Sequence, residues 1–145
     1  MNEVKLQDQV HKFREIARHL PQIEIPTQHF LMDGMYVRQT FIRAGTAFVG
    51  RVHKKFHFFM VLKGRAEVTF DNEVKTIYAG MTLMCPPGTR RAGITLEDTV
   101  FAGVFRTDET ELKSIEEDLT EYDPATSYGV GNVILPHVVK YEPTS

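Results

Sequence analysis

Apolar and polar positions follow a helical period near both ends of the chain and alternate one by one between them. In residues 4–20 the apolar side chains recur every three or four positions, which predicts an amphipathic helix that Pro21 ends. A second period of this kind places Leu112, Ile115 and Leu119 on one face. The sequence therefore predicts a helix towards each end of the chain.

The region between the helices has the pattern of short antiparallel strands. Asp33-Gly34 is a favourable hairpin turn between residues 29–32 and residues 35–42. Further strands, each bounded by turn residues, are predicted at residues 48–53, 58–62, 66–70, 73–78, 81–85, 91–95 and 99–105. Many short strands at this spacing are typical of an all-β barrel or sandwich.

The second helix and the residues after it allow three finer predictions. Asp108, followed three residues later by Glu111, fits an N-cap with its reciprocal partner. The acidic run at residues 116–118 is interpreted as the solvated face of the helix. Residues 120–145 hold three prolines around an apolar segment at 133–135, and we expect them to form an arm that packs on the barrel or on a neighbouring subunit.

Length and charge narrow the architecture and the partners. With 145 residues, of which 42% are hydrophobic, the chain is expected to form a single domain with its own core. Its parts are expected to be a helix over residues 1–21, a β-barrel over 22–106 and a helix with an extended arm over 107–145. The net charge of −2 supplies no overall basic field, which argues against nucleic acid as a partner.

The N-terminus and the cysteine content indicate where the protein is made. The first residues have neither the cationic nor the apolar stretch of a signal peptide, and the longest apolar run, residues 58–62, is too short to cross a bilayer. The single cysteine, Cys85, excludes an intramolecular disulfide, and its apolar strand predicts a small buried hydrophobe. We therefore expect a soluble protein of a reducing cytoplasm, with no signal peptide and no membrane partner.

Residues 50–91 resemble the two-part signature of the cupin superfamily. The residues that carry the resemblance are His53, His57, Gly64, Gly80, Pro86 and Gly88. The resemblance implies a cupin-type antiparallel β-barrel, jelly-roll-like, to which the N-terminal helix and the short C-terminal helix with its arm are added. It also places Arg51, His53, His57 and Arg91 at the four positions where cupins carry metal ligands. Two of these four positions hold arginine.

We consider these four residues a candidate ligand-binding site inside the barrel, and two chemistries compete for it. His53 and His57 are suitable ligands for divalent iron, manganese, nickel or zinc, and a third ligand would have to come from another strand, for example from His29 or Glu97. An arginine cannot be a metal ligand, however, and its fixed charge repels a cation.

An anion suits the same positions better than a cation does. Two arginines and two histidines can hold a carboxylate or a phosphate through charge-assisted hydrogen bonds. No cofactor is then expected. A plainer interpretation is that two basic residues form rim ion pairs across a hairpin with two acidic ones, namely Arg90 and Arg91 with Glu97 and Asp98.

Several short motifs within residues 22–120 also resemble, in the same order, a family of small cupin-like proteins of tailed bacteriophages and their prophages. They are Tyr36-Val37-Arg38, Ala44-Gly45-Thr46, His53-Lys54, His57, Lys63-Gly64, Pro87-Gly88-Thr89-Arg90-Arg91 and Glu97-Asp98-Thr99-Val100. This resemblance implies an accessory or virion-associated protein without enzymatic activity, made in the host cytoplasm, with other phage structural proteins as partners. The alternative is a metal-dependent cupin enzyme or a small-molecule-binding protein that uses His53 and His57. The apolar faces of the first helix and of residues 133–135 predict a homo-oligomer.

Overall fold

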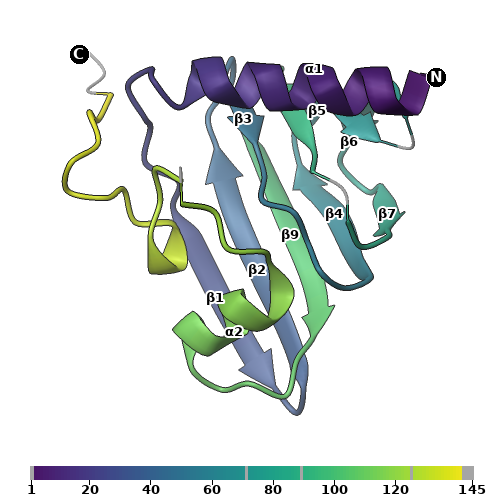
Figure 1. The fold of residues 1–145 in the computed structure, drawn as a ribbon. Helices are drawn as coiled ribbons and strands as arrows, with labels where there is room; N and C mark the ends of the chain where they lie inside the picture. Colours follow the sequence, from purple (N-terminus) through teal and green to yellow (C-terminus); the bar gives the residue numbers. More distant parts are fainter. Residues whose placement is uncertain (1, 71, 89, 125, 142–145) are drawn as a thin grey trace.

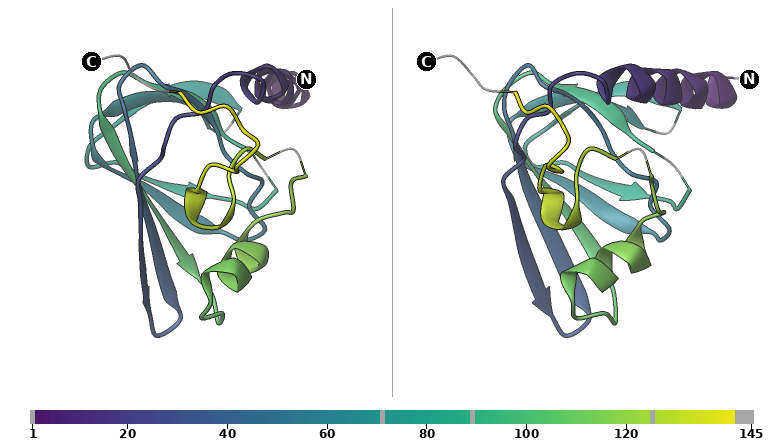
Figure 2. Two further views of the ribbon diagram at one scale, coloured as in Figure 1. Left: turned by 90° about the vertical axis from the view of Figure 1, so that its left-hand side faces the viewer. Right: turned by 60° about the vertical axis from the view of Figure 1, so that its left-hand side comes forward.

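The computed structural model describes residues 2–70, 72–88, 90–124 and 126–141. Two antiparallel sheets face each other, and helix α1 (Asn2–Ala17) lies across one end of the molecule (Figure 1). Helix α2 (Leu112–Leu119) and the segment after it lie over the open side between the sheets (Figure 2). Mostly β structure with a helix towards each end is the predicted architecture.

Each sheet is built from strands that are distant in the sequence. The larger sheet has the order β1-β2-β9-β4-β7, with β1 (Thr27–Met32), β2 (Met35–Ile42), β9 (Thr99–Arg106), β4 (His57–Lys63) and β7 (Thr82–Cys85). The smaller sheet has the order β3-β8-β5-β6, with β3 (Ala47–Val49), β8 (Ala92–Thr95), β5 (Arg65–Phe70) and β6 (Glu73–Tyr78). Within the described part of the chain, no strand pairs across the two sheets, so the predicted barrel has the form of two facing sheets.

The predicted strands are all present, and the hairpin turn between β1 and β2 is confirmed. Asp33 and Gly34 have positive φ angles of 50° and 77°, as a two-residue hairpin loop requires. Alternation is confirmed as well, since Ala66 and Val68 of β5 are buried while Glu67 between them is exposed.

The strand predicted at residues 48–53 is shorter than expected, because β3 ends at Val49. The following residues leave the sheet and pair with the end of α2. The Val52 carbonyl accepts a hydrogen bond from the Glu121 N–H at 2.9 Å, and the Lys54 N–H donates to the Leu119 carbonyl at 2.8 Å. This detour ties residues 51–54 to the end of α2.

Both helices differ from their predicted ends. Helix α1 ends at Ala17 instead of residue 20, because Pro21 disfavours the helical conformation of Leu20 and the Gln22 side chain donates to the Ala17 carbonyl at 2.9 Å. The predicted N-cap of α2 is wrong: Glu111, not Asp108, occupies the cap position.

The loop before α2 explains the misplaced cap. The Thr107 hydroxyl accepts the backbone N–H of Glu109 at 3.2 Å and donates to the Asp118 carboxylate at 2.7 Å. These bonds hold a non-helical turn at the point where Asp108 would have to start the helix.

The arm packs on its own chain. Gln22 exchanges backbone hydrogen bonds with it, accepting from Tyr141 at 2.7 Å and donating to Val139 at 2.8 Å. The Tyr128 hydroxyl donates to the Ile23 carbonyl at 2.7 Å, and a short 3₁₀ helix, η1 (Val130–Asn132), follows. The arm therefore closes over the segment that enters β1.

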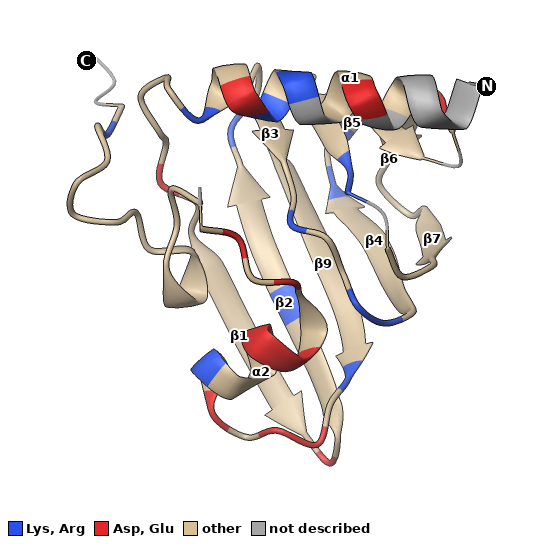
Figure 3. Ribbon diagram, viewed as in Figure 1, with Lys and Arg blue, Asp and Glu red and all other residues tan. Residues whose placement is uncertain are grey.

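Two groups of buried side chains lie at either end of the space between the sheets. One joins both sheets and comprises Ile42, Val61, Ala66, Val68, Ile77, Leu83, Cys85 and Phe101. The other joins the larger sheet to α2 and comprises Tyr36, Phe105, Ile115 and Leu119. Figure 3 shows acidic residues gathered over α2 and the loop before it. Among the described residues, neither helix has the length and apolar character of a membrane-spanning helix.

Candidate functional site

The inward-facing residues of the larger sheet form rows across its strands. One row runs through His29, Arg38, Gly103, Phe59 and Leu83, on β1, β2, β9, β4 and β7. The neighbouring row towards the β1–β2 hairpin holds Tyr36, Phe105, His57 and Cys85. The row on the other side holds Thr40, Phe101 and Val61. Polar side chains therefore occupy the first two rows, and the third is mainly apolar.

Residues of these rows, together with β3, the segment after it, Arg91 and the arm, line a cavity of about 210 Å³. The four residues singled out by the sequence, Arg51, His53, His57 and Arg91, all line it. Arg38 lines it as well and was not among the predicted site residues. The fold thus brings three arginines and two histidines to one interior space.

The two histidine rings lie next to each other against an aromatic residue. Their centroids are 4.4 Å apart, and the Phe105 ring stacks at 5.6 Å from His53 and 4.8 Å from His57. Gly103 makes room for this ring, because a Cβ there would lie 2.6 Å from the Phe105 ring. The pair therefore has a rigid apolar backing.

The hydrogen bonds of His57 define its tautomer. Its Nδ1 lies 3.2 Å from the Lys55 carbonyl, which can only accept, so Nδ1 carries the proton. Its Nε2 then presents a lone pair, and the Arg91 guanidinium donates to it at 3.2 Å. The nitrogen that would bind a metal is thus already engaged by an arginine.

Arg91 reaches this position from the residue just before β8. Its guanidinium carbon lies 4.4 Å from the centre of the Phe59 ring, a cation–π contact. Burial lowers the pKa of Arg91, but an arginine stays charged at any ordinary pH. Among the described residues, no Asp or Glu forms an ion pair with it. A positive charge therefore faces the cavity next to a phenyl ring and a neutral imidazole.

Burial and neighbouring positive charge keep both histidines neutral. Desolvation, then His57, Arg91 and Arg38, lower the pKa of His53 to about 3, against a hydrogen bond with the Arg51 backbone. Desolvation, with a smaller contribution from Arg91, lowers the pKa of His57 to about 4, opposed by its bond to the Lys55 backbone. The cavity therefore gains no charge from its histidines at neutral pH.

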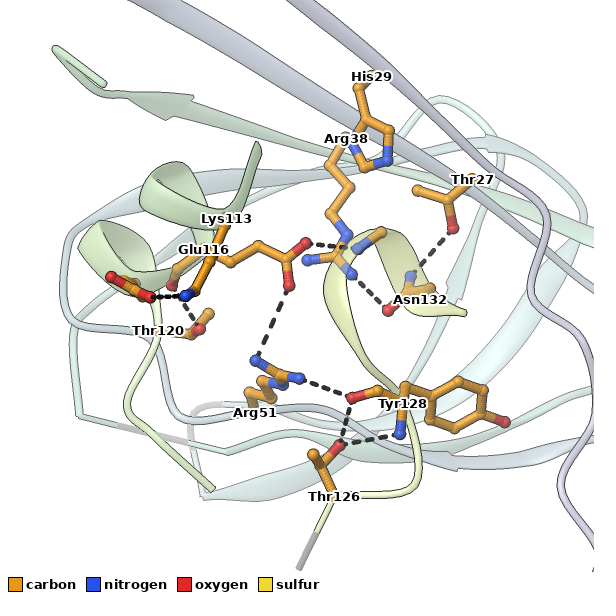
Figure 4. Close-up of polar contacts among 12 residues, drawn as sticks. Thr27, His29, Arg38, Arg51, Lys113, Glu116, Thr120, Thr126, Tyr128 and Asn132 are labelled. Carbon is orange, nitrogen blue, oxygen red and sulfur yellow. Dashed lines mark hydrogen bonds and ion pairs between the residues drawn. The ribbon is translucent and has the colours of Figure 1, made fainter. Parts of the chain in front are cut away.

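Of the other two arginines, Arg51 pairs with the buried carboxylate of Glu116 on α2, and Arg38 is bonded to Asn132 beside it (Figure 4). Its oxygens accept the Gly131 N–H at 2.7 Å and lie 3.9 Å from an Arg51 guanidinium nitrogen. Arg51 also donates to the Tyr128 carbonyl at 3.0 Å, and Arg38 donates to the Asn132 side-chain oxygen. Burial lowers the pKa of Arg38, and the charge of Glu116 raises it. Glu116 therefore connects α2 and the arm to the arginines of the cavity.

Two sequence-based interpretations are wrong here. The run at 116–118 is not uniformly solvated, since the Glu116 side chain is only 6% exposed. The rim pairing of Arg90 and Arg91 with Glu97 and Asp98 does not form either. Instead these residues have other partners: Arg90 lies 3.6 Å from Asp123, Glu97 pairs with Arg65 at 3.3 Å, and Asp98 accepts the Ala44 N–H at 2.9 Å.

The residues present do not fit a metal ion. Two imidazoles are available, one of them already bonded to Arg91, and His29 is engaged by the Tyr36 hydroxyl at 2.6 Å. Among the described residues, no three His, Cys, Asp or Glu side chains are grouped so that they could hold a metal. Arginines at the other two ligand positions add repulsion.

Charge balance favours an anion instead. Three arginines contribute three positive charges and Glu116 removes one, so that the cavity carries a net charge of about +2 with neutral histidines. Arginine N–H groups that remain unused can donate to a carboxylate or a phosphate in parallel pairs.

Acid should destabilise the protein through His57. The unfolded chain takes up a proton near the ordinary pKa of 6.5, while the folded protein does so only near 4. The free energy of unfolding is therefore expected to be highest above pH 6.5 and to fall by about 2 kcal/mol by pH 5 through this residue. His53, whose pKa is about 3, loses a similar amount, so urea unfolding at pH 7 and pH 5 measures the sum, and the difference between the unaltered protein and His57→Gln isolates the part due to His57. An equally steep fall in His57→Gln would show that His57 is not the group responsible.

Sequence reasoning missed Arg38, Glu116, Asn132 and Tyr128. Arg38 has the same parity along β2 as the buried Tyr36 and Ile42, so strand alternation could have found it. No comparable signal marks Glu116 or the arm residues, because their contacts depend on how the arm folds back.

No family model matches the chain, and no curated protein matches it either. Solved structures do share its fold. A cupin superfamily protein from Desulfitobacterium hafniense matches with a TM-score of 0.52 and 14% identity, over 61% of this chain and 83% of that one. A Cupin 2 conserved barrel domain protein from Salinispora arenicola matches with 0.50 and 19%, over 58% and 76%. KdgF from Halomonas sp. matches with 0.51 and 16%, over 59% and 80%.

Proposed function

Because this chain has a cupin fold with three arginines facing its interior, we propose that it binds a small anion between its sheets, without a metal ion and without catalysing a reaction. The observation that carries the proposal is Arg91. Its guanidinium faces the cavity, lies over the Phe59 ring, donates to the neutral imidazole of His57 and forms no ion pair with an Asp or Glu among the described residues. An anion would supply the missing counter-charge.

The neighbouring groups support an anion in chemical terms. Arg51 lies on the same cavity and is 28% exposed, so its guanidinium can reach a ligand without breaking the fold. The histidines can add positive charge to the site when they are protonated, because a bound anion favours the imidazolium and raises the pKa of the histidine. An anion that keeps its own charge, such as sulfate, should therefore bind more tightly as the pH falls from 7 towards 5.

Thermal unfolding with a panel of salts tests the proposal. At least one of acetate, citrate, phosphate and sulfate should raise the melting temperature. Once the concentration of that anion exceeds its dissociation constant, the rise should be proportional to the logarithm of the concentration. Sodium chloride at equal ionic strength controls for screening, and Arg106→Met, at a residue whose side chain is 82% exposed, controls for the loss of one positive charge. No shift with any of the four anions would overturn the proposal.

The alternative is a metal-dependent cupin enzyme or binding protein that uses His53 and His57. What favours it is that the two rings lie side by side at 4.4 Å. Metal analysis of protein purified without a histidine tag separates the two functions. Stoichiometric iron, manganese, nickel or zinc that is lost in His53→Ala and His57→Ala would establish the alternative.

The biological setting that we propose is an accessory or virion-associated protein of a tailed bacteriophage or prophage, acting as a homo-oligomer. The ordered short motifs of the sequence support the phage origin, and tail, capsid or lysis genes beside its own gene would test it. Exposed apolar side chains on and after α1, Ile16 at 65% and Leu20 at 57%, support self-association. Light scattering that gives the monomer mass at tens of micromolar would contradict it.

A further inference from the structure

We infer that the anion bound in this cavity is a carboxylate with an apolar body, such as a short aliphatic or aromatic acid, and not a fully polar anion such as inorganic phosphate. The inference rests on the proposed function and names its ligand class. It comes from the way the cavity wall is divided between charged and apolar side chains.

The charged end of the cavity lies in two rows of the larger sheet. Arg38 belongs to the row through Gly103 and Phe59, and His57 belongs to the next row towards the β1–β2 hairpin. Arg91 joins this end through its contacts with His57 and Phe59. A carboxylate placed here can accept hydrogen bonds from the guanidinium of Arg91. No Asp or Glu among the described residues forms an ion pair with that guanidinium.

The opposite end of the cavity is lined by hydrocarbon. Phe101 lies in the row beyond Arg38, next to Thr40, and its ring centroid is 5.5 Å from that of Phe48 and 4.8 Å from that of Phe59. Ile25 and Ile42 complete this wall. Phe59 belongs to both ends, since the guanidinium of Arg91 lies over its ring.

The apolar wall is also shared with a second hollow. Ile25, Ile42 and Phe48 line a larger space of about 710 Å³ that extends under α1 to Phe13 and along the arm to Tyr128. Arg51 lines both spaces too, whereas Arg38, Arg91 and the two histidines line the smaller one alone, so the apolar wall adjoins further space while Arg38 and Arg91 lie away from it. This arrangement suits a ligand whose charged group lies innermost and whose hydrocarbon points towards α1.

The dimensions agree with a small amphipathic acid. A volume of about 210 Å³ corresponds to roughly seven water-sized groups. A phosphate would fill the charged end alone and leave the phenyl and isoleucine side chains in contact with water. A carboxylate of six to nine non-hydrogen atoms would cover both ends, and each methylene that it buries should improve affinity about fourfold.

Titration calorimetry with four probes tests the inference: acetate, hexanoate, inorganic phosphate and hexylamine, all at pH 7. Hexanoate is expected to bind at least tenfold more tightly than acetate or phosphate, and hexylammonium, which has the same tail and the opposite charge, is expected not to bind. Two substitutions that preserve β-branching adjust the apolar wall. Ile25→Thr should weaken hexanoate while leaving acetate unchanged, and Thr40→Val should strengthen hexanoate without weakening acetate.

The outcomes separate this inference from the proposed function. Acetate and phosphate that bind as tightly as hexanoate, and depend on Arg91, would overturn the apolar body and leave the anion site in place. Hexylammonium that binds as well as hexanoate would show an apolar cavity that does not discriminate between ligands of opposite charge. That result would overturn both the inference and the proposed function. No binding of any anion, in a protein whose thermal unfolding is cooperative, would likewise overturn both. Because Thr40→Val is a gain of affinity, misfolding cannot imitate its result.

Discussion

Replacing Glu116 by glutamine is expected to destabilise the free protein by about 2 kcal/mol and, at the same time, to strengthen anion binding. Glutamine keeps the shape of the side chain and can still accept the Gly131 N–H, which the carboxylate accepts at 2.7 Å. It removes the negative charge that offsets Arg38 and Arg51. Loss of one partner of a buried pair costs about 3–5 kcal/mol, and the 3.9 Å separation and the partial exposure of Arg51 reduce that figure here.

The affinity should change in the opposite direction, because Glu116 competes with the ligand for the same arginines. Without it the cavity carries one more uncompensated positive charge, and a carboxylate replaces the missing one. Glu117→Gln is the matched control, since Glu117 is on the same helix with its side chain 67% exposed and an ion pair to Lys113 at 4.0 Å. That exposed pair contributes little to stability. Equal destabilisation by the two substitutions in urea unfolding, or unchanged anion affinity in Glu116→Gln, would contradict this assignment.

Replacing Arg91 by methionine is expected to weaken anion binding by roughly ten- to a hundredfold, which corresponds to the loss of one charge-assisted hydrogen bond. Methionine keeps an unbranched apolar stem against Phe59, where sulfur packs favourably near the ring, so the fold should persist. Arg91→Lys keeps the charge but loses the paired donors, and we expect an intermediate affinity. Arg106→Met serves again as the control for charge alone.

A second readout separates a ligand-binding role of Arg91 from a structural one. The Arg91 guanidinium donates to Nε2 of His57 and its charge helps to lower the pKa of that imidazole. In Arg91→Met the pKa of His57 should therefore rise from about 4 towards its ordinary value, although burial will still hold it below 6.5. NMR titration of the histidine ring protons measures this. A pKa of His57 that does not move would show that the guanidinium does not face the imidazole in solution.

Most of the fold could be predicted from local patterns. Strand alternation and turn residues were sufficient to place β1, β2, β5 and β6 within two residues of their observed ends. This is because the geometry of a hairpin is determined by residues that are adjacent in the sequence. The end of β3 was not predictable in this way. The residues after Val49 turn away to pair with Leu119 and Glu121, about 70 positions further along the chain.

The site was predictable only in part, for the same physical reason. The spacing of His53, His57 and Arg91 against the turn glycines was sufficient to nominate residues that the fold then brings to one cavity. The spacing alone did not show whether the Arg91 side chain faces the cavity or forms an ion pair at the rim. Glu116 was interpreted as solvated because it belongs to an acidic run. Its burial depends on Gly131 and Arg51, which only the folded arm and the detour after β3 bring to it.

Titration calorimetry of tag-free protein at pH 7, with acetate and hexanoate in one series and zinc chloride in a parallel one, decides what the cavity holds. We expect at least one of the carboxylates to bind at one site per chain and to lose most of its affinity in Arg91→Met, while zinc gives no stoichiometric site. Zinc that binds at one site per chain and is lost in His57→Ala, with neither carboxylate binding, would contradict the anion site and establish a metal centre in its place.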